Sequence, residues 1–102
     1  MRTNLEKNIE KRGSAVAKRF GAWPIKLAII GGRGWPDHTI VAPGGWIAFI
    51  EYKRPGGEFQ PLQKYVHKRL EFLGFRVEVI TSNDQVDEFF EEFFDGSAAP
   101  AG

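Results

Sequence analysis

The sequence predicts an α/β domain in which helices flank a mixed four-stranded sheet, and two patterns support this prediction. Amphipathic stretches with helical spacing alternate with short β-branched and aliphatic runs that are typical of strands. The predicted order is helix, three strands, helix, strand and a C-terminal helix. A helix between two strands is the crossover that makes them parallel, whereas the first three strands follow one another as an antiparallel meander.

Start and stop signals delimit these elements. We expect helices between Thr3 and Gly21, between Pro61 and Gly74, and from Ser82 through Phe94. We expect strands at residues 23–30, 38–42, 46–53 and 75–80. A tight turn at Pro43-Gly44-Gly45 joins the second strand to the third.

Length and composition fit one soluble domain. The chain has 102 residues, of which 42% are hydrophobic and 26% charged. We expect residues 1–95 to form the domain and residues 96–102 to be a flexible tail. The absence of cysteine excludes disulfides and thiolate chemistry. No apolar run approaches the about 20 residues that span a bilayer, and the charged start lacks a signal-peptide core, so we expect no membrane association and a cytoplasmic location.

Basic and acidic residues are separated along the chain. Residues 1–54 contain ten Lys or Arg and four Asp or Glu, whereas residues 55–102 contain four and nine. Six of those nine acids lie between Asp84 and Asp95. The rest of the domain is therefore basic, which suits a polyanion such as nucleic acid but is also typical of a solvated surface.

Two carboxylates and a lysine are predicted to meet at one end of the sheet. Glu51 and Lys53 are two residues apart on a strand, so they share a face, while Tyr52 points to the other. The apolar run before them indicates a central strand, where charges need partners or a function. Asp37 precedes the antiparallel neighbour, whose start lies beside this strand end.

Such a group suits phosphodiester hydrolysis. Asp37, Glu51 and the backbone carbonyl of Tyr52 offer the oxygen ligands that Mg²⁺ or Mn²⁺ prefers. Lys53 can orient an attacking water and stabilise charge on a phosphodiester. The simpler interpretation is a surface ion pair between Glu51 and Lys53, with Asp37 as an ordinary turn residue.

At these residues the sequence resembles the VRR-NUC domains of the PD-(D/E)XK nuclease superfamily, in their small stand-alone phage and bacterial form. The resemblance covers about residues 5–90. It rests on the segments GRGWPD at 32–37, PGG at 43–45, EYKRPG at 51–56 and PLQ at 61–63. It implies a restriction-endonuclease-like αβββαβ core with a mixed four-stranded sheet flanked by helices, followed here by a C-terminal helix.

The resemblance also implies roles for the site residues. Asp37 and Glu51 would hold the divalent metal, and Lys53 would serve the attacking water. Gln63 matches a glutamine of the family's second helix. A glutamate of the first helix is matched by Glu10, which we take as the candidate, and less well by Glu6, although Glu6 lies nearer the apolar stripe of that helix.

The sequence departs from the family pattern at three positions. Trp35 stands where a small aliphatic residue is usual, and Gly13 and Ser14 replace bulky apolar residues of the first helix. None of the three coincides with a proposed ligand.

Further residues are candidates for contact with nucleic acid. Arg33 lies between glycines and can approach a phosphate, and Lys7 and Lys11 can contact a backbone independently of sequence. Trp35 can stack on an unpaired base or pack over the sheet. The alternative interpretation of these basic residues is that they are ordinary solvated side chains on the surface. We expect His67 to be structural or peripheral.

The sequence thus predicts a Mg²⁺- or Mn²⁺-dependent endonuclease acting on DNA. Through the resemblance, the expected substrate is branched or four-way junction DNA, in a bacterial or phage-infected cell, without a small-molecule cofactor. The aromatic stripe around Phe90 in the last helix most simply buries that helix, and a surplus of it would form a homodimer interface. The alternatives are a non-catalytic nucleic-acid-binding module with this fold and a small interaction protein with an accidental E-x-K.

Overall fold

A computed structural model of the protein describes residues 3–29 and 32–94. It contains the seven elements that the sequence predicts, in the predicted order. They are α1 (Asn4–Arg19), β1 (Trp23–Ile25), β2 (His38–Ala42), β3 (Trp46–Tyr52), α2 (Pro61–Phe72), β4 (Arg76–Ile80) and α3 (Asn83–Phe94). Within the described part of the chain, no helix has the length and apolar character needed to cross a membrane.

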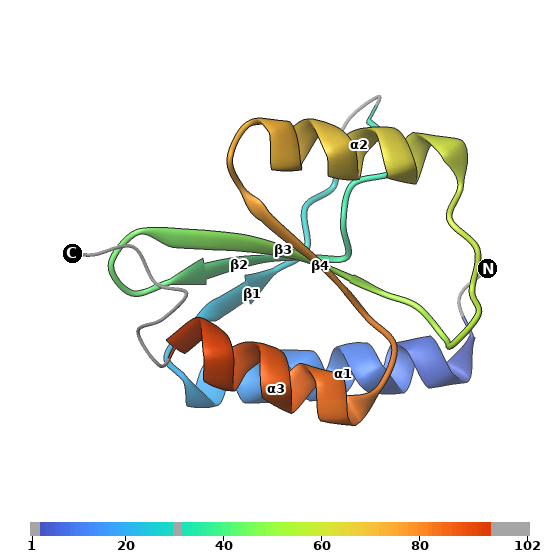
Figure 1. Ribbon diagram of the computed structural model, residues 1–102. Coiled ribbons are helices and arrows are strands. Elements are labelled where there is room, and N and C mark those ends of the chain that lie inside the picture. Colours follow the sequence, from blue (N-terminus) through green and yellow to red (C-terminus); the bar gives the residue numbers. More distant parts are fainter. Residues whose placement is uncertain (1–2, 30–31, 95–102) are drawn as a thin grey trace.

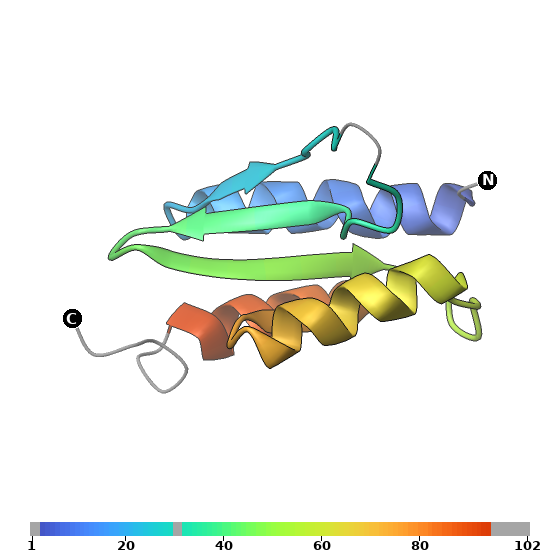
Figure 2. The same cartoon turned by 90° about the horizontal axis from the view of Figure 1, so that it is seen from above.

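The four strands form one sheet in the order β1-β2-β3-β4. The first three strands pair antiparallel, and β4 pairs parallel to β3, which confirms the predicted mixed sheet. Figure 1 shows α1 and α3 on one face of this sheet and α2 on the other. Seen from above, β2 and β3 run side by side in opposite directions (Figure 2).

The main core lies between the sheet and the α1–α3 layer. Buried side chains of both helices meet those of β2 and β3 there. The aromatic stripe of α3 is used inside the domain, since Phe89, Phe90 and Phe93 are each less than 5% exposed. Burial within the domain, the simpler of the two roles expected for this stripe, therefore accounts for these three residues.

The helices begin as expected from their caps. The Thr3 hydroxyl accepts a hydrogen bond from the Glu6 amide at 3.1 Å, and the Ser82 hydroxyl accepts one from the Gln85 amide at 3.2 Å. Pro61 is the first residue of α2, where its missing N–H costs nothing.

The first strand is shorter than predicted. It covers Trp23–Ile25 instead of residues 23–30, and residues 26–29 form no strand. Ile25 pairs with Thr39, one residue from the start of β2, so the chain beyond Ile25 has almost no partner strand left. The expected strand end at Ile30 and the expected tail at residues 96–102 lie outside the described residues.

Candidate active site

Strand register brings the two predicted carboxylates together. His38 is the partner of Ile50 in the antiparallel β2–β3 pair, so Asp37 stands opposite Glu51 one step further. Oδ2 of Asp37 accepts a hydrogen bond from the Tyr52 amide at 2.8 Å, which fixes the carboxylate against the end of β3. Directly opposite residues share a face of a sheet, so the carboxylates of Asp37 and Glu51 are neighbours.

Glu51 is an acid held in a buried position. Only 3% of the residue is exposed, and this burial raises the pKa of its carboxyl group above the usual value. The adjacent negative charge of Asp37 raises this pKa further. The contact with His67, whose Nε2 lies 3.3 Å from Oε1 of Glu51, acts in the opposite direction. The fold therefore keeps two carboxyl groups close together at an energetic cost.

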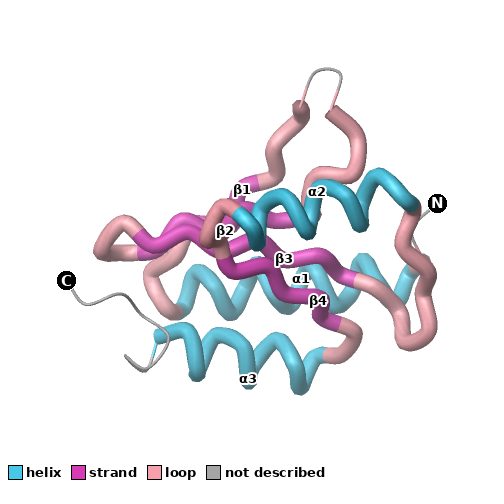
Figure 3. Tube along the Cα trace, turned by 45° about the horizontal axis from the view of Figure 1, so that its top comes forward, coloured by secondary structure: helices cyan, strands magenta, loops and turns pink. Residues whose placement is uncertain are grey.

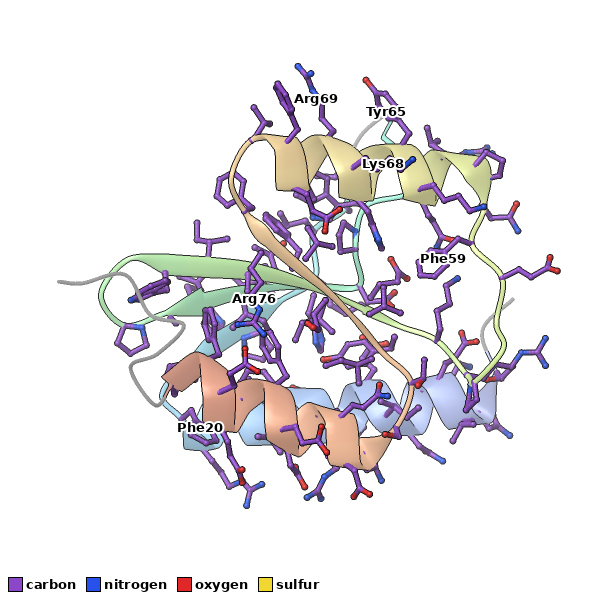
Figure 4. The ribbon with its side chains drawn as sticks, in the orientation of Figure 1. Phe20, Phe59, Tyr65, Lys68, Arg69 and Arg76 are labelled. Atoms are coloured by element: carbon purple, nitrogen blue, oxygen red, sulfur yellow. The ribbon has the colours of Figure 1, made fainter. Side chains whose placement is uncertain are left out.

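Lys53 is held beside this pair by α2 and the loop before it. Its Nζ donates a hydrogen bond to Oε1 of Gln63 at 3.2 Å and lies 5.1 Å from the ring centre of Phe59. The same Gln63 oxygen accepts a hydrogen bond from the backbone N–H of Gln60 at 2.9 Å. Figure 4 shows Phe59 in the space between α2 and the end of β3. Lys53 and Gln63, which were predicted from the motif, thus contact each other.

Of the two candidate glutamates of α1, the structure places Glu6 near Lys53. Oε2 of Glu6 accepts the Arg54 amide at 3.2 Å. Glu6, Lys53 and Gln63 line one hollow of about 450 Å³. Glu10, the candidate preferred from the family pattern, instead lies with Lys26 and His38, at 2.7 and 3.4 Å. The helix glutamate next to the site is therefore Glu6, as its position near the apolar stripe suggested.

His67 is closer to the site than predicted. The residue is buried, contacts Glu51, and lies edge-on to Phe59 with ring centres 5.4 Å apart. Its spacing of four residues from Gln63, one helical turn, was the available sequence signal. Phe59 gave no such signal, because an aromatic residue in a loop matches no motif.

The structure places the residues predicted to contact nucleic acid in different surroundings. Arg33 is exposed in a loop that packs tightly on α2, where a Cβ on Gly34 would lie 2.7 Å from the Leu62 carbonyl oxygen. Trp35 packs over the sheet: its Nε1 donates to Thr39 Oγ1 at 3.2 Å and its ring meets Phe49 edge-on.

Lys7 and Lys11 are exposed on α1. Both border a hollow of about 380 Å³ that Glu10, Lys26 and His38 also line. They therefore belong with the Glu10 side of α1 rather than with the hollow beside Lys53.

The donor set fits a hard divalent cation. Across residues 3–29 and 32–94, no group of three or more His, Asp or Glu side chains is arranged to hold a metal ion. The available ligands are then the carboxylates of Asp37 and Glu51 and the Tyr52 carbonyl. Mg²⁺ commonly binds one or two carboxylates and takes its remaining ligands from water and phosphate. A cation there would also balance the two adjacent acids.

A mixed sheet that carries two acids and a lysine at one end defines a nuclease-like α/β domain, and relatives agree with this class. No family model matches the chain. The chain is 38% identical over 84 residues to "Putative nuclease p44" of Acyrthosiphon pisum secondary endosymbiont phage 1, across 82% of this chain and 90% of that protein. A solved structure described as "VRR_NUC domain" superposes with a TM-score of 0.83 and 29% identity, covering 90% of this chain and all of that one. The chain belongs to the VRR-NUC family of nuclease domains.

Proposed function

We propose that this VRR-NUC domain is a Mg²⁺- or Mn²⁺-dependent DNA endonuclease that cuts branched or four-way junction DNA as a homodimer. The observation that carries the metal-dependent chemistry is the buried Glu51 carboxylate beside Asp37, at the same strand end as Lys53. The preference for branched DNA and the dimer rest on the resemblance to the family.

Asp37, Glu51 and the Tyr52 carbonyl would hold the ion. When bound, Mg²⁺ or Mn²⁺ would supply Lewis-acid polarisation of the phosphodiester and make water a better nucleophile. The hydrogen bond from the Tyr52 backbone amide to Oδ2 would keep the Asp37 carboxylate in position for this role. His67 is close enough to keep the Glu51 carboxylate oriented.

Lys53 would act on the phosphodiester itself. Its ammonium group can orient the attacking water and stabilise the negative charge that develops on the phosphate oxygens. The side-chain oxygen of Gln63 on α2 accepts a hydrogen bond from this ammonium group and fixes it, and the Phe59 ring lies beside it. From the other side, Glu6 holds the backbone at Arg54, so two helices fix the position of Lys53.

Charge determines which side of the domain faces DNA. The exposed residues of α3 include Asp84, Glu88, Glu91 and Glu92, which would repel a phosphate backbone. Figure 3 shows α3 and α2 on opposite sides of the sheet. DNA would therefore approach from the end of β3 and the side of α2, away from α3.

Cleavage of labelled DNA tests the proposal. Four-way junction, flap and linear duplex DNA are incubated with the protein in Mg²⁺ or Mn²⁺, with EDTA and a Lys53→Ala variant as controls. We expect paired nicks in the junction, lost in EDTA and reduced at least about 100-fold by Lys53→Ala. Lys64→Ala on the outside of α2 is the matched control and should cut like wild type at saturating DNA, because it removes an exposed charge outside the proposed metal site.

Other results would overturn parts of the proposal. Binding of the junction without cleavage in either metal would favour the non-catalytic binding module. Equal cutting of all three DNAs would remove the structural specificity, and a monomer in sedimentation of the active protein would remove the homodimer.

A further inference from the structure

A chain of polar contacts lies on the face of the sheet opposite to the carboxylates. The Tyr52 hydroxyl is 2.9 Å from Nδ1 of His38, and Nε2 of the same ring is 3.4 Å from Oε2 of Glu10. That carboxylate oxygen is also 2.7 Å from Nζ of the exposed Lys26. We call Glu10, His38 and Tyr52 the His38 cluster.

The His38 cluster is buried, which makes its polar groups costly unless they are paired. Tyr52 is 1% exposed, His38 3% and Glu10 9%. The two rings also meet edge-on, with centres 5.2 Å apart. Lys26 lies at the open end of the cluster and balances the Glu10 charge. A phenylalanine at position 52 would fill the same core volume without requiring any of these partners.

Helix α1 is shaped to admit the Tyr52 hydroxyl. A Cβ on Gly13 would lie 2.0 Å from this hydroxyl oxygen and 2.7 Å from the adjoining ring carbon, so there is no room for any side chain at this position. Glycine inside a helix costs about 1 kcal/mol relative to alanine. The departure from the family pattern at Gly13 therefore makes room for a hydroxyl that packing alone does not need.

The two residues of the cluster that carry rings are each adjacent in sequence to a residue of the proposed site. Tyr52 lies between Glu51 and Lys53, and His38 follows Asp37. Successive residues of a strand point to opposite faces, so fixing Tyr52 and His38 on one face fixes the backbone from which Asp37 and Glu51 point to the other. The Tyr52 amide also donates to the Asp37 carboxylate.

We propose that Glu10, His38 and Tyr52 are positioning residues that hold the Asp37 and Glu51 carboxylates at the spacing required for a divalent ion, from the opposite face of the sheet. This inference rests on the proposed metal-dependent function. It gives Glu10 a role different from the direct site role expected from the family pattern. Partners outside the ligand shell commonly contribute 10–100-fold to metal affinity or activity.

The test deletes one hydroxyl and measures metal binding without DNA. Mn²⁺ binding to wild type and to Tyr52→Phe is titrated by electron paramagnetic resonance, and cleavage is measured at rising Mn²⁺ concentration. We expect Tyr52→Phe to raise the Mn²⁺ dissociation constant about tenfold. Saturating Mn²⁺ should restore most of the cleavage, and the DNA dissociation constant in EDTA should stay unchanged.

Tyr65→Phe is the matched control, because it deletes the same hydroxyl from a residue that is 64% exposed on α2. It should bind Mn²⁺ like wild type. Glu10→Gln keeps the side-chain shape and is the second variant, with the same expected weakening, should Tyr52→Phe not fold.

The outcomes separate the two proposals. If wild type binds Mn²⁺ and cuts DNA while Tyr52→Phe and Glu10→Gln bind Mn²⁺ equally well, the positioning role is wrong and the proposed function stands. If wild type neither binds Mn²⁺ nor cuts DNA, the proposed function fails and the positioning role fails with it.

Discussion

Helices α2 and α3 have the same length, 12 residues, yet they use their inner faces differently. Helix α3 buries Val86 and three phenylalanines against the sheet and α1, whereas α2 buries only His67 and Leu70. Helix α2 leaves large apolar side chains in solvent, with Phe72 82% exposed. In Figure 4 Tyr65 and Arg69 point away from the sheet.

The difference follows from what lies beneath each helix. Gln63 and His67 of α2 face the charged end of β3, where they contact Lys53 and Glu51. Under the proposed function, α2 must leave a phosphodiester access to these groups and cannot close over them with apolar side chains. Helix α3 has no such constraint, so we expect α3 to contribute mainly to stability and α2 to catalysis.

The largest effect expected from this contrast is on folding. Phe90→Ala on α3 should lower the free energy of unfolding by about 4 kcal/mol, because the ring is fully buried and leaves a cavity. Phe72→Ala on α2 should change it by less than about 0.5 kcal/mol. Urea denaturation measures both. Equal losses for the two variants would show that α2 packs as tightly as α3.

The reverse effect is expected on catalysis. Gln63→Ala removes the oxygen that holds Lys53 in place, and misplacement of a catalytic group can cost about 100-fold in rate. The variant should stay folded under the same urea conditions. Single-turnover cleavage in Mn²⁺ is the measurement, with Lys64→Ala on the same helix as control. A loss of less than threefold would assign Lys53 placement to other residues.

A smaller effect concerns the cost of the site itself. Burial raises the pKa of Glu51, so the folded chain binds a proton at this carboxyl group more tightly than the unfolded chain does. The free energy of unfolding therefore falls as pH rises from the pKa of Glu51 in the unfolded chain to its higher pKa in the folded chain. Above the folded pKa the carboxylate is ionised in both states, and the full cost of burying its charge is present. Glu51→Gln removes this charge, so without metal at pH 7 it should raise the Tm by about 4 °C, or ~1 kcal/mol.

The pH dependence checks the cause. Thermal melts of Glu51→Gln and wild type in EDTA should differ at pH 7 and converge as pH falls below the usual glutamate range, about 4. A wild type more stable than Glu51→Gln at pH 7 would show that the buried carboxylate is well compensated. The variant should not cut DNA at either pH.

Most of the fold could be predicted from the sequence, because its apolar patterns agree with local start and stop signals. Helix α3 is the clearest case: its phenylalanines recur at helical spacing, three of them are buried, and Phe94 packs against the core. The meeting of Asp37 and Glu51 at one end of the sheet could be predicted from the short turn between β2 and β3 and from the alternation of side chains along a strand. The length of β1 could not be predicted, because the register of its partner strand decides where pairing stops.

The surroundings of the site were less predictable. For the glutamate of α1, the helical wheel favoured Glu6 and the family pattern favoured Glu10, and the sequence could not decide between them because the choice depends on how α1 crosses the sheet. His67 had the right spacing from Gln63, but its contact with Glu51 depends on the tilt of α2. The pairing of Tyr52 with Gly13 joins residues far apart in sequence that no short motif links.

One oxygen, Oε1 of Gln63, accepts hydrogen bonds from both the backbone N–H of Gln60 at the start of α2 and the ammonium group of Lys53. Fraying of that first turn would therefore release the lysine while the α1–α3 core stays intact. Ends of helices with few buried contacts open more readily than the whole domain. On heating, this chain is accordingly expected to inactivate before it unfolds, with its rate falling while the tertiary signal of the core is still native.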